Sequence, residues 1–278
     1  MIDIKRFSLN RIISPSLELG EFYAFASSVG LRKVELRNDI GGKDPVDGLR
    51  PAEAARIAAD HDIEVITINA LQKFNLATAR AKASEELQAL LELSRAIRCK
   101  AVVLCPNNDP ADGRDAARRL GETVEALAAF GPSFEDAGIL GYVEPLGFGI
   151  SSLASLVTAQ DAIRESGFAC YRIVLDTFHH YIGPDDSGIL GKAYSVASTG
   201  LVHVSGVEAS IATGDYRDEH RVLAGPADRM KSKEQIRKLV DSGYEGDISF
   251  EPFSPAVQKL SKVELAQAVG KSLEYLRA

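Results

Sequence analysis

The stretch RIVLDTFHH (172–180) joins a β-branched, apolar run to a polar residue at its end, Asp176. Three other stretches in the second half of the chain have the same form, namely LGYVEPLG (140–147), LVHVSGVE (201–208) and DISFEPF (247–253), and they lead to Glu144, His203 and Glu251. Proline follows both glutamates and biases each towards an extended backbone. We therefore expect Glu144 and Glu251 at the last position of a strand.

Strands of this kind alternate with helices along the whole chain. The expected strands are residues 4–9, 33–37, 64–71, 101–107, 140–145, 171–176, 201–206 and 247–251, and the expected helices are 17–30, 50–62, 80–97, 115–130, 151–167, 189–198, 232–243 and 261–277. Strict alternation without a linker predicts a single (β/α)8 TIM barrel domain over residues 1–278. In such barrels the active site lies at the carboxyl ends of the strands, where we expect all four polar residues.

The chemistry of these four strand ends predicts a metal site. Burial of an unpaired carboxylate removes hydration worth several kcal/mol, and a divalent cation compensates for that loss. The oxygens of Glu144, Asp176 and Glu251 and the imidazole of His203 form a mixed set that suits one Mn, Zn, Co or Mg ion. An exposed carboxylate is an ordinary explanation for one such residue and a poor one for four.

Composition limits the class of partner. A net charge of −7 argues against nucleic acid and fits a small substrate that is neutral or chelated by a metal. The three cysteines form no CxxC motif, which fits a reducing cytoplasm. The chain has no apolar run near the ~20 residues of a membrane span, and its first residues lack a signal sequence, so we expect a soluble, unprocessed protein. Assembly into a homo-oligomer is left open.

Two carboxylates beside a metal suit proton transfer next to a carbonyl group. We interpret Glu144 and Glu251 as the acid/base pair, each with one oxygen on the ion and the other towards the substrate, and which of them abstracts the proton first stays open. The long polar segment 207–230 predicts a loop that covers the substrate. Glu35, Asn10 and Asn69 also end strands, and they are candidates either for substrate hydroxyl groups or for turns.

Several motifs resemble the sugar-phosphate isomerase/epimerase superfamily of xylose-isomerase-like barrels, and within it the inosose (2-keto-myo-inositol) isomerases. They are VELR (34–37), INALQKFN (68–75), DTFHH (176–180), DEHRV (218–222) and FEPFSPAVQKLSKVELAQAV (250–269). The resemblance implies one divalent ion on Glu144, Asp176, His203 and Glu251, with both glutamates exchanging the proton. It also implies that His179 and one or more of Arg217, His220 and Arg221 hold substrate oxygens. AGPAD (224–228) departs from the family's Pro-Gly-x-Gly-x-x-Asp, so the path of this loop is not predicted.

Three other functions remain open on the same barrel. A ketose 3-epimerase or a hydroxypyruvate isomerase would share the ligands and the chemistry. A nuclease similar to endonuclease IV would need further histidines at the early strand ends, where this chain has Asn69 and Pro106-Asn107. A sugar-binding barrel without activity would not need both glutamates beside a complete metal set.

Overall fold

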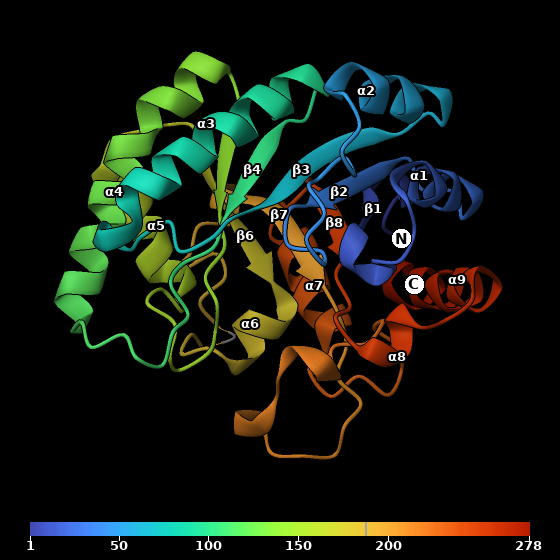
Figure 1. Ribbon diagram of the computed structural model, residues 1–278. Helices are drawn as coiled ribbons and strands as arrows, with labels where there is room; N and C mark the ends of the chain where they lie inside the picture. Colours follow the sequence, from blue (N-terminus) through green and yellow to red (C-terminus); the bar gives the residue numbers. More distant parts are fainter. Residues whose placement is uncertain (187) are drawn as a thin grey trace.

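Parallel strands pair in chain order from β1 to β8, and β8 pairs with β1 to close a barrel (Figure 1). The computed structural model describes residues 1–186 and 188–278. Its strands are β1 Phe7–Asn10, β2 Lys33–Arg37, β3 Glu64–Leu71, β4 Ala101–Leu104, β5 Leu140–Val143, β6 Tyr171–Asp176, β7 Thr199–Val204 and β8 Asp247–Phe250. The predicted (β/α)8 TIM barrel is confirmed.

Helices surround the barrel on its outside (Figure 1). Among the described residues they are α1 Leu19–Ser28, α2 Pro51–Asp60, α3 Arg80–Ala96, α4 Ala116–Ala137, α5 Leu156–Ser166, α6 Thr177–Ile182, α7 Ser232–Asp241, α8 Pro255–Gln258 and α9 Lys262–Arg277. Local signals explain several of their ends. Asp115 caps α4 through Arg118 N, Ser261 and Glu264 form a capping box on α9, and Gly167 ends α5 in the left-handed conformation.

A layer of apolar side chains lies inside the barrel, next to the predicted ligands and closer to the amino ends of the strands. Because side chains alternate along a strand, the residue two positions earlier shares the same face. Val174 therefore lies below Asp176, and Leu201 lies below His203. Both are buried in a small apolar cluster with Val103, against which Tyr142 packs. The carboxyl end of the barrel thus carries polar groups on an apolar floor.

The prediction of a helix at residues 189–198 is wrong. The chain enters α6 directly after β6, because the carboxylate of Asp176 caps the helix by accepting a hydrogen bond from Phe178 N at 2.6 Å. Within 189–198 the chain instead makes a bridge between Leu190 and Tyr194 and a short 3-10 turn at Val196–Ser198. Gly191 has a φ of 73°, a left-handed conformation that interrupts a right-handed helix.

Other boundaries shift by a few residues. The first strand is Phe7–Asn10, because residues 4–6 form a 3-10 turn, and the helix expected from residue 151 begins at Leu156 with Ser155 as its cap. Glu144 and Glu251 directly follow β5 and β8 rather than ending them. Their N–H groups still donate to Leu104 O (3.0 Å) and Val204 O (2.9 Å), so the backbone continues the strand pairing.

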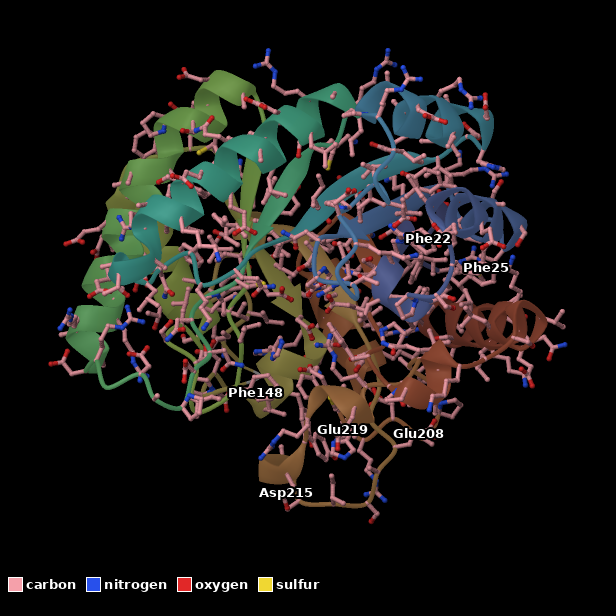
Figure 2. All side chains as sticks on the ribbon, viewed as in Figure 1. Phe22, Phe25, Phe148, Glu208, Asp215 and Glu219 are labelled. Carbon is pink, nitrogen blue, oxygen red and sulfur yellow. The ribbon has the colours of Figure 1, made fainter. Side chains whose placement is uncertain are left out.

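The segment between β7 and α7 projects from the carboxyl end of the barrel (Figure 2). Its base is tied by Gly206 N to Val222 O at 2.7 Å, and the stacked rings of Tyr181 and Tyr216 hold it against α6. In AGPAD, Asp228 accepts hydrogen bonds from Val207 N and Ser232 N, which defines the return of the loop.

The two ends of the chain lie side by side (Figure 1), and Ile2 N donates to Arg277 O at 3.3 Å. No helix in the described part of the chain is both long enough and apolar enough to cross a membrane.

Candidate metal centre and active site

Glu144, Asp176, His203 and Glu251 come together at the carboxyl ends of β5, β6, β7 and β8. One ligand atom from each lies within 4.8 Å of the others, and all four side chains are buried. The parallel pairing of β6 with β7 sets Asp176 directly beside His203. The structure thus brings together the four residues that the strand pattern predicted as metal ligands.

The imidazole of His203 lies at the centre of this group. Its Nδ1 is 2.8 Å from Glu144 Oε1, 3.2 Å from Glu251 Oε2 and 4.0 Å from Asp176 Oδ2. Its Nε2 faces the other way, 3.1 Å from Glu35 Oε2. One ring nitrogen therefore points to the three carboxylates of the group and the other points to a fourth carboxylate.

The charges of the site fit a divalent cation. Four buried carboxylates, those of Glu35, Glu144, Asp176 and Glu251, face two buried guanidiniums, those of Arg37 and Arg221. The carboxylates outnumber the guanidiniums, so the pocket holds an excess of negative charge that a divalent ion would offset. Three carboxylate oxygens and one imidazole nitrogen are also a donor set that Mn, Zn, Co and Mg accept.

The ionisable groups strongly shift one another. Burial alone would lower the pKa of His203, but Glu251, Glu35 and Glu144 together raise it well above its usual value. Burial would raise the pKa of Glu251, but His203 and Arg221 hold it well below its usual value. Burial raises the pKa of Asp176 to about 7, with Arg221 opposing the rise. Shifts of this size in one pocket are typical of functional sites.

Arg221 reaches into the group from the loop after β7. Its Nη2 donates to Asp176 Oδ2 at 2.5 Å and to Glu251 Oε2 at 2.8 Å. The rings of Phe178 and Phe253 lie 4.9 and 4.7 Å from its guanidinium carbon, so cation–π contacts hold the group on two sides. The structure therefore places Arg221 against two of the predicted ligands.

The two histidines of DTFHH face different surroundings. The ring of His179 packs edge-on against Phe148 and Phe178 at 5.2 and 5.3 Å, and its Nδ1 has no hydrogen-bond partner among the described residues. Burial, together with nearby Arg221, lowers the pKa of His179 to about 3, so the ring is neutral. His180 instead lines a hollow with Asp185 outside the metal group.

Arg217 and His220 lie further out on the same loop. Arg217 donates to Gly214 O and Tyr216 O, and its backbone N–H donates to His220 Nδ1 at 3.0 Å. Arg217 also lines a hollow of about 410 Å³ at the barrel mouth. The other lining residues include Asn108, Gly147, Phe148, Tyr216 and Asp218, and Figure 2 shows Phe148 near the base of the projecting loop. Neither Arg217 nor His220 touches the metal group.

Arg37 is a site residue to which the sequence analysis gave no role. Its Nη1 donates to Glu251 Oε1 at 2.8 Å, while its other nitrogens form a two-point pair with Asp39 at 2.7 Å. Asn10 and Asn69 also donate to Glu251 Oε1, at 3.2 and 3.4 Å. A signal was present, because Arg37 follows Glu35 by two and so shares its face of the strand.

Glu35 is fully buried beside Nε2 of His203. Burial alone would raise its pKa, but the adjacent His203 outweighs burial, so the pKa of Glu35 is below its usual value. Cys105, by contrast, is a buried thiol whose Sγ lies 3.5 Å from Glu144 Oε2, and burial raises its pKa well above the usual value. A protonated thiol is a poor nucleophile, so Cys105 serves as a wall of the site.

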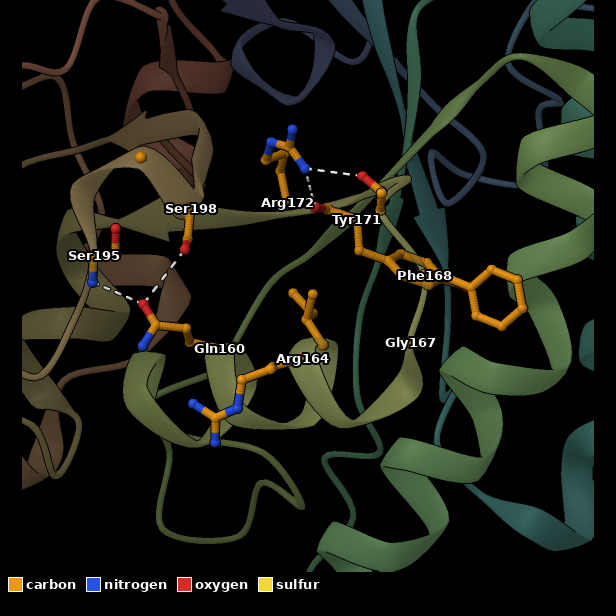
Figure 3. A pocket seen from close by; sticks show the side chains of 11 residues that line it. Gln160, Arg164, Gly167, Phe168, Tyr171, Arg172, Ser195 and Ser198 are labelled. Carbon is orange, nitrogen blue, oxygen red and sulfur yellow. Dashed lines mark hydrogen bonds between the residues drawn. The ribbon is translucent and has the colours of Figure 1, made fainter.

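A further hollow of about 590 Å³ lies at the amino ends of β6 and β7, and Figure 3 shows the side chains that line it. It is lined by residues before β6 and β7, among them Gln160, Arg164, Phe168 and Ser198. The guanidinium of Arg172, also in its wall, donates to the carbonyls of Ala169 and Tyr171. Because TIM-barrel active sites lie at the carboxyl ends of the strands, this hollow is at the wrong end for catalysis.

Residues 23–278 match the protein family described as "xylose isomerase-like TIM barrel". The chain belongs to the xylose isomerase-like TIM barrel family. A search of curated proteins gave no significant match.

Solved structures agree with this assignment. A xylose isomerase domain containing protein from Salmonella typhimurium LT2 is 33% identical, with a TM-score of 0.93, over 100% of this chain and 99% of that chain. The IolI protein, solved with a bound zinc atom, is 20% identical with a TM-score of 0.86, over 97% of this chain and 99% of its own. D-psicose 3-epimerase from Clostridium cellulolyticum H10, solved with D-tagatose, is 16% identical with a TM-score of 0.75, over 98% of each chain. The last two likenesses show a shared fold.

Proposed function

We propose that this xylose isomerase-like barrel is a metal-dependent isomerase or epimerase that interconverts cyclic polyol ketones such as 2-keto-myo-inositol. The observation that carries the proposal is the buried group of Glu144, Asp176, His203 and Glu251, with its ligand atoms within 4.8 Å. These residues would hold one Mn, Zn, Co or Mg ion. When bound, the ion supplies a Lewis acid for the carbonyl oxygen of the substrate. Zinc in the IolI structure supports this choice of metals.

Glu144 and Glu251 would move the proton between the carbon beside the carbonyl and its neighbour, through an enediolate. Their surroundings differ. Glu251 Oε1 accepts hydrogen bonds from Arg37, Asn10 and Asn69, whereas Glu144 Oε2 faces the Cys105 thiol at 3.5 Å. Glu144 Oε2 is thus the less firmly held carboxylate oxygen of the two, and it has more freedom to exchange a proton with a substrate.

His179 and Arg221 would orient the substrate oxygens. The free Nδ1 of a neutral His179 suits a hydroxyl group, and Arg221 lies beside both Asp176 and Glu251. The two buried guanidiniums already pair with carboxylates, which leaves them little capacity for a phosphate group. An uncharged polyol ketone is therefore the substrate class that we favour, with Glu35, Asn69, Arg217 and His220 as further candidate contacts.

The net charge of −7 and the absence of a CxxC motif bear on location and partners. We propose a cytoplasmic enzyme of carbohydrate metabolism, in inositol breakdown, that acts on a small molecule and not on nucleic acid or membranes. Homo-oligomer formation stays open. A ketose 3-epimerase is the main alternative, since the structural relatives include the D-psicose enzyme solved with D-tagatose.

Incubation of the metal-loaded protein with 2-keto-myo-inositol in D2O is expected to give isomerised inosose with deuterium at the reacting carbon. The label enters because a glutamic acid that returns the proton first exchanges it with solvent. NMR and mass spectrometry of the product measure the label, with fructose as the comparison substrate, which we expect to react more slowly. Unlabelled product would contradict proton transfer through a solvent-exchanging acid. Brisk epimerisation of a ketose with no turnover of any inosose would refute the substrate and leave the metal and carboxylate chemistry in place.

A further inference from the structure

The two ring nitrogens of His203 face different carboxylates. Nδ1 points to Glu144 Oε1 at 2.8 Å and Glu251 Oε2 at 3.2 Å, and Nε2 points to Glu35 Oε2 at 3.1 Å. A neutral imidazole binds a cation through the nitrogen that carries no proton, so the proton must then be on the other nitrogen. The hydrogen bond that the second nitrogen makes decides which form is present.

Two hydrogen bonds fix the carboxylate of Glu35 where it can accept a hydrogen bond from Nε2–H of His203. Thr67 Oγ1 donates to Glu35 Oε2 at 2.5 Å, and Asn10 Nδ2 donates to Glu35 Oε1 at 3.2 Å. The same Asn10 amide donates to Glu251 Oε1 at 3.2 Å, which ties the position of Glu35 to that of a predicted ligand. Glu35 itself is fully buried and is not one of the four residues whose ligand atoms converge.

We propose that Glu35 is a positioning residue for the metal centre. Its carboxylate accepts the Nε2–H of His203 and leaves Nδ1 free of a proton, aimed at Glu144, Asp176 and Glu251. Because the His203 ring separates Glu35 from those carboxylates, Glu35 acts on the metal through His203 and not by touching the substrate. Outer carboxylates of this kind orient a ligating histidine and increase its basicity. This inference rests on the metal site of the proposed function.

The first test is the metal affinity of the metal-free protein, measured for Mn²⁺ and Zn²⁺ by competition with a chelating indicator dye. Glu35→Leu removes the acceptor for Nε2–H, and we expect it to weaken metal binding by about 10–100-fold. Glu35→Gln keeps an amide oxygen as acceptor, so it is expected to lose less. Ser8→Ala is the matched control, since Ser8 is buried in the adjacent β1 and its hydroxyl has no partner among the described residues. The control should bind metal as the wild type does.

The second test observes the tautomer directly in the wild-type protein. The chain has 5 histidines, so ¹⁵N labelling of histidine gives a spectrum simple enough to assign. In the Zn²⁺-loaded protein we expect His203 to carry its proton on Nε2 and to bind the metal through Nδ1. Binding through Nε2 would overturn the inference. This measurement and the Glu35→Gln affinity decide the question even if Glu35→Leu does not fold.

The outcomes separate this inference from the proposed function. If wild-type protein binds no divalent ion, the proposed function falls and the role of Glu35 falls with it. If wild type binds the ion and Glu35→Leu binds it equally tightly, only the role of Glu35 is overturned. A raised KM for 2-keto-myo-inositol with unchanged metal affinity in that variant would instead make Glu35 a substrate contact, one of the two roles that its place at a strand end allows.

Discussion

Replacement of Glu144 or Glu251 by glutamine is expected to lower turnover by about 10²–10⁴-fold in a protein that still folds. Glutamine keeps an oxygen donor for a metal but removes the group that takes up and returns the proton. Turnover with 2-keto-myo-inositol measures the loss, and circular dichroism and metal content show whether fold and occupancy are kept. Near-normal turnover in both variants would show that our assignment of the acid/base pair is wrong.

The two variants are expected to differ in stability. Both oxygens of Glu251 accept charged hydrogen bonds, Oε1 from Arg37 at 2.8 Å and Oε2 from Arg221 at 2.8 Å. An amide offers only one oxygen, so Glu251→Gln breaks one of these charged hydrogen bonds, and such a loss costs about 1.5–3 kcal/mol. Arg37 keeps its pair with Asp39 and Arg221 keeps its pair with Asp176, so neither guanidinium is left unpaired. Glu144 contacts neither arginine directly, so Glu144→Gln is expected to unfold at the higher temperature of the two and is the cleaner test of catalysis.

Asp176→Ala and His203→Ala are expected to lose most of the bound metal, because each removes one of four converging ligands. Asp176→Ala also removes the cap of α6 and one partner of Arg221, so it is expected to lower stability as well as occupancy. Elemental analysis after extensive dialysis measures the metal, and thermal unfolding measures stability. His180→Ala is the matched control, since this neighbour of His179 faces Asp185 and not the metal group. Full occupancy in both ligand variants would contradict the assignment of the site.

The barrel and the convergence of the four candidate ligands could be predicted because both rest on local patterns. Alternating apolar runs and helices define a βαβ chain, and parallel strands in a closed barrel bring their carboxyl ends together. Polar residues at the carboxyl ends of four such strands are therefore expected to lie close together. The position of the sixth helix was not predicted correctly. Asp176, a predicted ligand, also caps the amino end of α6, so the helix begins directly after the strand. No loop therefore separates β6 from α6, whereas the prediction had placed the helix after a loop.

The role of Arg37 could not be predicted in the same way. The two-residue spacing from Glu35 gives the strand face of Arg37 but not its partner. Its contact with Glu251 joins residues 214 positions apart in the chain and depends on the closure of the barrel. The loop after β7 posed a similar problem. Arg217, His220 and Arg221 are all polar candidates on one loop. The hydrogen bonds of Val222 with Gly206 and of Ser254 N with Arg221 O, which hold Arg221 at the base of the loop, join segments that are not adjacent in the sequence. The sequence therefore indicated three candidate residues on this loop, but not that Arg221 is the one that contacts Asp176 and Glu251.

A titration of metal-free protein with Mn²⁺ shows whether activity depends on one bound ion, with bound metal and turnover of 2-keto-myo-inositol measured on the same samples. We expect that metal-free protein is inactive, that activity rises in proportion to occupancy, and that both level off at one ion per chain. Zn²⁺, Co²⁺ and Mg²⁺ are expected to restore activity to different extents. Full activity in protein that elemental analysis shows to be free of metal would contradict the proposed metal dependence, as would activity that requires more than one ion per chain.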